Sequence, residues 1–293
     1  MIEYLVLLSC IGFLLFLVPG RHRKYAAIAG WTFIILALFA NLNEYFAENN
    51  FLYPFMAILS VPFLYITAKF LMLEDERALN LSRAAAVAFI IYAPFDMLSS
   101  IPGFPNLGNW LIGMVVTEII WILNVLSFSV TLTCMDTLTE QVISTGICGD
   151  LLKNAITRNG YSVEIILGCT GIQSIAIMLG VAAAIPTTTK QKILAFLIIA
   201  PTIYILNLFR NVFVIMAYTD QWFPYWPEVA GNGQPGYESF FWAHNVIAEV
   251  TALIILVIIA YGLFTIIPKL GNYADDLYQM YAGEIRKACG KSK

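Results

Sequence analysis

Residues 240–267 read FFWAHNVIAEVTALIILVIIAYGLFTII, an apolar run in which Glu249 is the only acidic residue. The run exceeds the roughly 17–25 residues that a helix needs to cross a bilayer. Seven more apolar runs of suitable length precede it, at 2–18, 25–42, 51–73, 84–102, 110–135, 166–186 and 191–209. The pattern predicts an all-α polytopic membrane protein, a bundle of seven to eight transmembrane helices with a small extracellular loop that contains strands.

The composition supports a membrane protein. Of the 293 residues, 60% are hydrophobic and only 12% are charged, whereas soluble chains carry roughly 25% charged residues. The net charge is −3, and no segment interleaves aromatic with basic residues, so nucleic-acid binding is excluded as a function. No basic region precedes the first apolar run, which we therefore expect to be a retained span. We expect one membrane-embedded domain over 1–293.

Lys and Arg in short connections mark the cytoplasmic side of a membrane protein. This rule makes 269–293 a cytoplasmic tail and leaves the polar stretches 136–165 and 218–239 as external loops. The basic residues that carry the assignment are Arg21, Arg23, Lys24, Arg77, Arg83, Lys190, Lys192, Lys269, Arg286, Lys287, Lys291 and Lys293.

The charge rule creates a conflict at 110–135, because both of its ends then lie outside. One solution is a re-entrant or interfacial helix, which Glu118 and Asn124 favour because a buried carboxylate in lipid is unfavourable. The other solution inverts the N-terminal half and places Arg21 outside. We prefer the first. Both solutions put the start of 166–186, the end of 191–209 and the start of 240–267 at the outer face.

Cys169 is the candidate nucleophile. It lies in NGYSVEIILGCTGIQSIAIML, where a β-prone stretch meets an apolar helix. A helix N-terminus favours the thiolate form of a nearby cysteine. Gly168 and Gly171 leave backbone access around the sulfur. Gln173, four residues on, is expected on the same helix face and is a supporting candidate.

Arg210 is the candidate oxyanion stabiliser. It lies in YILNLFRNVFVIMAY, where a charge that faces lipid costs at least ~2.5–3.5 kcal/mol. Its fixed fork of N–H donors can hold a carboxylate or an oxyanion. Asn207 on the same face and the adjacent Asn211 are supporting candidates. For a lone arginine the alternative is snorkelling to the outer headgroups.

His244, at the start of the last run, is the candidate base, since histidine titrates near neutrality. Glu249 is five residues later, off the face of His244 in an α-helix, and is not assigned as its partner. Cys169, Arg210 and His244 lie on three consecutive predicted helices at one membrane face. Together they supply a nucleophile, an oxyanion stabiliser and a base.

The remaining cysteines indicate no metal chemistry. Cys10 and Cys289 are interpreted as small apolar fillers, and Cys134 and Cys148 either fill space or pair as an external disulfide. The chain contains no CxxC pair, HExxH motif or glycine-rich phosphate loop. We therefore predict no metal site and no cofactor.

The strings LGCTGIQSIAI, NLFRNV and FWAHN, within 160–250, carry a resemblance. In this order they resemble the exosortase and archaeosortase family, and GCTGIQSIA is the most specific of them. The resemblance implies a membrane-embedded cysteine transpeptidase of the archaeal type, in the cell membrane, with its active site at the extracellular face. By it, Cys169 would form a thioester, Arg210 would stabilise the oxyanion or orient the thiolate, and His244 would shuttle the proton.

The resemblance also implies the partners. Such enzymes act on secreted proteins with a C-terminal sorting signal: a short motif, Pro-Gly-Phe in archaeal members, then a transmembrane helix and a basic tail. Cleavage is coupled to transfer of the new C-terminus to a membrane lipid. In 136–165, turn signals at Gly146 and Gly160 favour a strand pair that binds an extended peptide. The Trp- and Tyr-rich 218–239 is expected at the interface, as a partial lid or an aromatic belt.

Two other functions remain open on the sequence. A transporter or channel would line its path with the intramembrane residues Asp96, Glu118 and Arg210, although no internal repeat supports a transporter. A non-enzymatic membrane scaffold is the third possibility. The oligomeric state and the acceptor lipid are not predicted.

Overall fold

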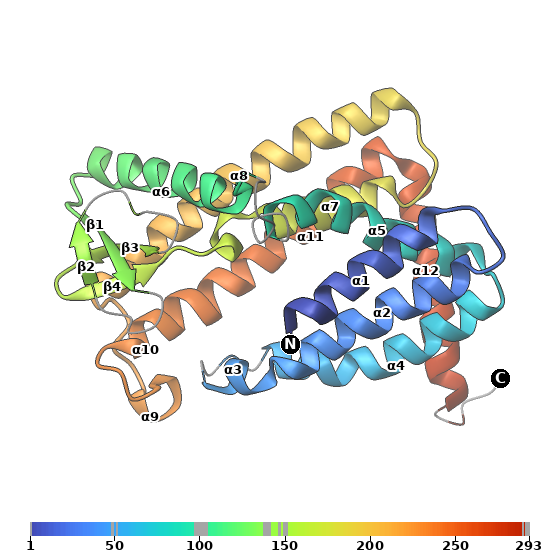
Figure 1. Ribbon diagram of the computed structural model, residues 1–293, viewed down its shortest axis with the longest axis horizontal. Coiled ribbons are helices and arrows are strands. Elements are labelled where there is room, and N and C mark those ends of the chain that lie inside the picture. Colours follow the sequence, from blue (N-terminus) through green and yellow to red (C-terminus); the bar gives the residue numbers. More distant parts are fainter. Residues whose placement is uncertain are drawn as a thin grey trace. The chain divides into compact units, whose positions relative to one another are not determined.

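The computed structural model describes residues 2–47, 50, 52–96, 105–136, 142–145, 148, 152–288 and 290, most of which are helical (Figure 1). The helices of twelve or more residues are α1 (Ile2–Leu17), α2 (Arg23–Ala40), α4 (Leu52–Met72), α5 (Glu76–Asp96), α6 (Leu107–Val125), α7 (Ile172–Ala183), α8 (Thr189–Thr219), α11 (Glu249–Ile266) and α12 (Pro268–Ala288). The shorter elements are α3 (Leu42–Ala47), the strands β1 (Thr131–Asp136), β2 (Val142–Thr145), β3 (Leu152–Arg158) and β4 (Tyr161–Glu164), the 3₁₀ turn η2 (Leu167–Thr170), α9 (Pro227–Ala230), α10 (Tyr237–Phe240) and the π-helix η3 (Phe241–Ala248).

Among the described residues, six helical stretches are long and apolar enough to cross a bilayer. They are Arg23–Ala47, Leu52–Met72, Glu76–Asp96, Leu107–Val125, Thr189–Thr219 and Tyr237–Ile266. Two shorter apolar helices, Tyr4–Leu17 and Ile172–Ala183, bring the total to the eight predicted runs. The prediction of an all-α polytopic membrane protein with a small strand-containing region is therefore confirmed.

The chain divides into two compact units. The first consists of Met1–Ile91, Ala176–Ile199 and Val257–Lys293, and the second of Tyr92–Ile175 and Ala200–Leu256. The single domain expected over 1–293 stays a prediction.

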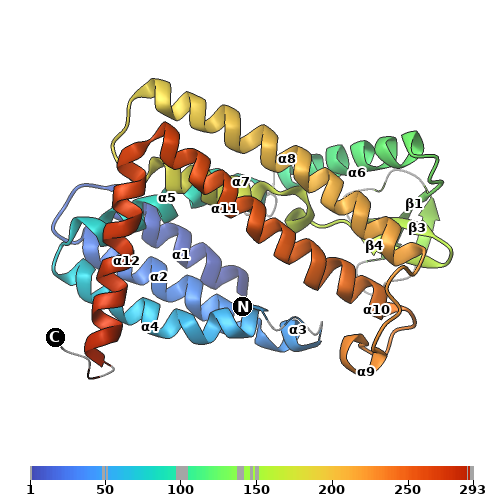
Figure 2. The same ribbon diagram turned by 180° about the vertical axis from the view of Figure 1, so that it is seen from behind.

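In the first unit, α1, α2 and α4 run side by side (Figure 1 and Figure 2). Glycine makes the α1–α2 approach possible, because a Cβ on Gly12 would lie 2.7 Å from the backbone nitrogen of Gly30. The Ser9 hydroxyl donates to the Gly30 carbonyl at 2.8 Å. Phe13 is fully buried and packs edge-on against Trp31. Small residues and two aromatic side chains thus form this helix pair, and the small residues are typical of packing in membranes.

Polar side chains of the first unit bond to one another. The Trp31 indole donates to the Ser82 hydroxyl at 3.0 Å, and the hydroxyls of Thr67 and Tyr281 lie 2.6 Å apart between α4 and α12. Lys69 and Glu284 form an ion pair between the same helices. The hydrogen bond from Lys69 holds the pKa of the Glu284 carboxyl below its ordinary value. The contacts of Tyr281 and Glu284 join α12 to α4.

In the second unit the four strands form an antiparallel sheet in the order β2-β1-β3-β4, at one end of α6 (Figure 1). Asn159 and Gly160 close the β3–β4 hairpin with φ values of 52° and 82°, the left-handed conformations of a two-residue turn. Asp220 accepts hydrogen bonds from Arg158 (3.0 Å) and Asn159 (2.8 Å), which fixes the hairpin to the end of α8. The predicted turn at Gly160 is therefore confirmed.

The structure also decides the open question about the external cysteines. Cys134 of β1 and Cys148 form a disulfide. Cys10 is a buried free thiol, in keeping with its interpretation as a filler. Three of the predictions concern residues outside those that the structure describes. They are the turn at Gly146, the interpretation of Cys289 as a filler and the end of the span 84–102.

The boundaries of several predicted segments were wrong. The run 110–135 is not one segment, because α6 ends at Val125, Ser127 turns left-handed (φ 58°), and β1 begins at Thr131. Its last residues, TLTC, alternate with the period of a strand, and the apolar average hid that alternation. The sheet consequently starts before 136 and has four strands among the described residues rather than a pair.

Two further predicted boundaries were wrong, because helices continue past polar residues. The helix predicted to end at 209 runs to Thr219, so Arg210 lies inside α8 and not at its outer end. The loop predicted over 218–239 is shorter, since α8 occupies its start and α10 begins at Tyr237. Apolar residues after Arg210 extend the helical pattern, and one charge does not end a helix.

Candidate functional site

Cys169 lies in η2, the 3₁₀ turn between β4 and α7. Ile166 before the turn is extended (φ −104°, ψ 173°), and its carbonyl accepts the N–H of Cys169 at 2.9 Å. Gly171 after the turn is left-handed (φ 77°), and α7 begins at the next residue. The half-buried free thiol therefore sits on a tight turn just ahead of a helix N-terminus.

Two features of the structure favour glycine at position 171. Its left-handed backbone disfavours any residue with a Cβ, and a Cβ there would lie 3.2 Å from the side chain of Asn207. Asn207 in turn contacts the cysteine, because its amide donates to the Cys169 carbonyl at 2.6 Å. The turn that carries Cys169 thus approaches α8 closely at Gly171.

A second amide completes this contact. Asn211, one helical turn after Asn207 on α8, donates to the same Cys169 carbonyl at 2.7 Å. Asn211 is only 5% exposed, so its side chain has few alternative positions. Two amides that both donate to one carbonyl hold the backbone of the cysteine against α8. The two asparagines nominated from the sequence therefore position Cys169 through its main chain.

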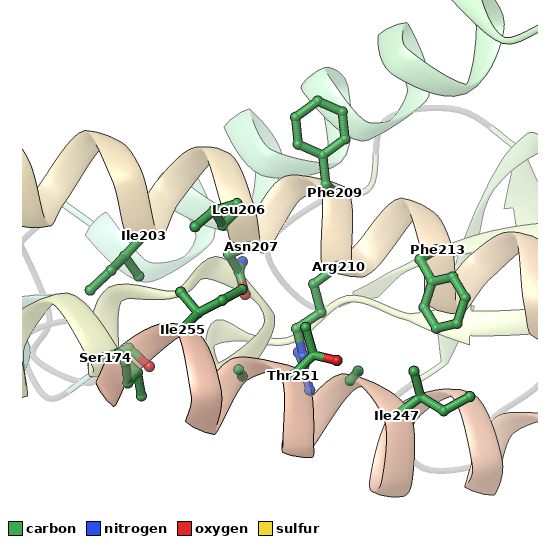
Figure 3. Close-up of a pocket in the computed structure, with 13 residues that line it drawn as sticks. Ser174, Ile203, Leu206, Asn207, Phe209, Arg210, Phe213, Ile247, Thr251 and Ile255 are labelled. Carbon is green, nitrogen blue, oxygen red and sulfur yellow. The ribbon is translucent and has the colours of Figure 1, made fainter. Parts of the chain in front are cut away.

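Arg210 lies between these asparagines and reaches toward α11, passing beside Thr251 (Figure 3). Its guanidinium lies 3.3 Å from Nε2 of His244. Burial raises the pKa of the Cys169 thiol, and the positive charge of Arg210 partly opposes that rise. Helix α8 thus contacts the predicted base through Arg210 and the main chain of the predicted nucleophile through Asn207 and Asn211. Because Arg210 bonds to His244 inside the protein, its side chain does not snorkel to the outer headgroups as the alternative proposed.

His244 lies in the π-helix η3, and π-helical turns occur frequently at functional sites. Its ring stacks on Phe240 at a centroid distance of 4.8 Å. Nδ1 lies 2.8 Å from the amide oxygen of Asn245, an acceptor, so Nδ1 carries the proton. Nε2 is then unprotonated and accepts from Arg210, a group that only donates. Asn245 is therefore the residue that sets the tautomer.

The expectation that Gln173 shares a helix face with Cys169 was wrong. The left-handed Gly171 separates the two residues, so the spacing of four residues does not lie within one helix. The Gln173 amide instead donates to the hydroxyl of Tyr92 at 3.1 Å. Sequence reasoning missed Tyr92, because only the packing of α5 and α7 brings it there.

An apolar groove runs beside Arg210 (Figure 3). Its volume is about 380 Å³, and α8 and α11 form its walls. Arg210 is the only charged side chain in the lining. The lining consists of Ser174, Ile203, Leu206, Asn207, Phe209, Arg210, Phe213, Ile247, Ala248, Thr251, Ala252, Ile255 and Leu256.

The residues nominated for a transport path have separate partners. The Glu118 carboxylate accepts the hydroxyl of Tyr204 at 2.7 Å, whereas Arg210 pairs with His244. Within the described part of the chain, no cluster of three or more His, Cys, Asp and Glu side chains suits a metal ion.

Comparison with known proteins agrees with the resemblance seen in the sequence. The pattern that defines transmembrane exosortases matches residues 2–233. Archaeosortase A of Natronomonas pharaonis is 26% identical over 87% of this chain and 79% of its own length. Archaeosortase A of Haloferax volcanii is 28% identical over 90% of this chain and 88% of its own. No solved structure matches the chain. The chain belongs to the transmembrane exosortase family.

Proposed function

We propose that the protein is a membrane-embedded cysteine transpeptidase. It cleaves the C-terminal sorting signal of secreted proteins through a thioester and transfers the new C-terminus to a membrane lipid. The signal is a Pro-Gly-Phe motif followed by a transmembrane helix and a basic tail. The observation that carries the proposal is on α8: Arg210 bonds to His244, and Asn207 and Asn211 on either side of it in the sequence bond to the Cys169 carbonyl. Family membership and the two archaeosortases support it.

Cys169, Arg210 and His244 each have a separate role in the proposed reaction. The Cys169 sulfur attacks the scissile carbonyl, and its proton passes to Nε2 of His244. Arg210 leaves His244 to donate to the oxyanion, which frees Nε2 for that proton. Collapse of the intermediate breaks the C–N bond, His244 protonates the leaving amine, and a thioester remains. A hydroxyl or amine of the acceptor lipid then attacks the thioester and releases the thiol.

The apolar groove supports a substrate that arrives through the membrane. Its lining is apolar apart from a few polar groups near Arg210. A sorting helix lying against α8 and α11 would bring the motif that precedes it to the level of Arg210. The substrate thus needs no aqueous channel.

The disulfide supports an active site on the extracellular side. Disulfides form and persist in oxidising compartments and are rare in reducing ones. Cys134 and Cys148 cross-link the sheet whose last strand leads to Cys169. The cross-link therefore supports an extracellular position for the sheet and for the turn that carries Cys169.

The test is processing of a secreted protein that carries the sorting signal. Cells expressing the wild type are compared with cells expressing Cys169→Ala, and Cys10→Ala serves as the matched control because Cys10 is a free thiol of α1. We expect processing to disappear with Cys169→Ala and to persist with the control. The mass of the product's C-terminus then identifies a lipid adduct or a free acid. Undiminished processing with Cys169→Ala would overturn the proposal and return transport to consideration.

A further inference from the structure

The strand β4 lies at an edge of the sheet, with β3 on one side. The two-residue turn fixes which of its main-chain groups pair: Tyr161 and Val163 bond to β3. The pattern continues past the strand, since the N–H of Ile165 donates to the carbonyl of Asn154 at 2.8 Å. Alternate residues must point the other way. The main-chain groups of Ser162, Glu164 and Ile166 therefore face the free edge.

Most of these edge groups are unpaired. Among the described residues, the N–H groups of Ser162, Glu164 and Ile166 and the carbonyls of Ser162 and Glu164 have no hydrogen-bond partner. The Ile166 carbonyl is occupied, because it accepts the N–H of Cys169. Ile166 itself is 52% exposed. The free edge of β4 therefore ends where the turn Leu167–Thr170, which carries Cys169, begins.

Side chains hold this strand in place without using its edge. The Ser162 hydroxyl lies 2.7 Å from that of Thr157, and Glu164 pairs with Lys153 at 3.1 Å, both across to β3. The hairpin turn is bonded to Asp220. A rigid edge binds a partner with less loss of conformational entropy than a flexible one.

We propose that the edge from Ser162 to Ile166 binds the extended segment of the substrate as an added strand and so delivers the scissile carbonyl to Cys169. This inference rests on the proposed function. Donors and acceptors that alternate at every second residue match an extended peptide, which pairs by main-chain hydrogen bonds. A lipid offers no such repeat. The opposite edge, β2, is separated from Cys169 by the rest of the sheet.

Proline substitution tests the edge in the full-length protein in membranes. Ser162→Pro and Glu164→Pro each remove an outward N–H and leave the bonds to β3 intact, because proline is tolerated on edge strands. The controls are Ser162→Ala and Glu164→Ala, which lose the side-chain bond but keep the N–H. Thr145→Pro removes an outward N–H from β2. We expect about a tenfold loss of kcat/KM for each β4 proline. The matching alanine variant should lose less, because it loses only the side-chain contact with β3, and Thr145→Pro should be near wild type.

A substrate series keeps the test decisive if a proline variant fails to fold. Substrates N-methylated at successive positions beside the scissile bond are offered to the wild-type enzyme. We expect processing to fall at every second position and to be unaffected between them. Equal processing at all positions, or Ser162→Cys cross-linking to a second copy in place of the substrate, would overturn the edge proposal. The proposed function survives that result as long as processing remains dependent on Cys169, and it fails if the wild type processes nothing.

Discussion

Polar side chains in the apolar helices are used differently in the two units. In the unit of Met1–Ile91, Ala176–Ile199 and Val257–Lys293 they form separate pairs, such as Trp31 with Ser82. In the unit of Tyr92–Ile175 and Ala200–Leu256, the polar side chains Asn207, Asn211 and Arg210 act on one turn and one histidine. The difference separates polar groups that stabilise packing from those that build a site.

The contrast has an energetic basis. A polar pair in apolar surroundings satisfies both of its members and contributes roughly 1 kcal/mol. An arginine inside a membrane helix is unfavourable unless something compensates its charge. Arg210 donates to a neutral imidazole, which leaves that charge available to a substrate anion. Mutations in the two units should therefore affect different quantities, turnover in one and stability in the other.

The largest effect is expected from Arg210→Lys. Lysine keeps the charge but loses the planar fork that can donate to His244 and to an oxyanion together. We expect turnover to fall about 100-fold or more, measured as the rate of substrate processing in membranes. Arg21→Lys, at an exposed bend between α1 and α2, is the control and should be neutral. Wild-type turnover with Arg210→Lys would place Arg210 outside the chemistry.

Asn211→Ala should have the next largest effect. It removes one of the two amides that hold the Cys169 carbonyl, so the thiol is positioned less well. We expect about a tenfold lower kcat with little change in KM. Asn124→Ala, at an exposed position of α6, is the matched control. An equal fall in the amount of folded protein, with kcat per folded molecule unchanged, would show that the amide serves stability alone.

Gly171→Ala should destabilise the turn that carries Cys169. The left-handed backbone costs a residue with a Cβ roughly 1–2 kcal/mol, and the added Cβ would press on Asn207. We expect the free energy of unfolding in detergent to fall by that amount, with lower activity in the folded fraction. Gly262→Ala is the control, since a Cβ there meets nothing within 4 Å. The same stability for both variants would contradict the constraint.

The smallest effect is expected from Ser9→Ala in the other unit. It removes the fully buried hydroxyl that bonds to the Gly30 carbonyl. We expect the free energy of unfolding to fall by about 1 kcal/mol and turnover per folded molecule to stay unchanged. Ser60→Ala, which loses only a bond within its own helix to the Ala57 carbonyl, should change stability less. A loss of turnover with Ser9→Ala would contradict the division between the two units.

Local patterns in the sequence predicted local structure well. The apolar runs gave the helices, and Asn159-Gly160 gave the hairpin turn. Chemistry alone nominated Arg210 and His244, which the fold joins by a hydrogen bond. Those residues were found because a charge and a histidine are conspicuous among apolar neighbours.

What the sequence did not reveal depends on tertiary packing or unusual backbone. Tyr92 is 81 positions from its partner Gln173, a separation that no spacing rule covers. Gly171 was interpreted as open space around the sulfur, whereas its left-handed turn separates Cys169 from the helix of Gln173. The π-helix around His244 has no recognisable sequence signal. It also alters the spacing argument by which Glu249 was set aside, since a π-turn bonds residues five apart.

The π-helical stretch Phe241–Ala248 lies between the Trp- and Tyr-rich segment that precedes it and α11. It sets the angle about the helix axis at which the residues before α11 are oriented relative to that helix. One residue added to or removed from a helix turns everything before it by about 100° and shifts it by about 1.5 Å. Deleting Ile247 would let the stretch relax to α-helical spacing and swing His244 away from Arg210, although neither side chain had changed. The last span is therefore more sensitive to a change of length than to most substitutions, because one residue added within 241–248 would also turn His244 away from Arg210.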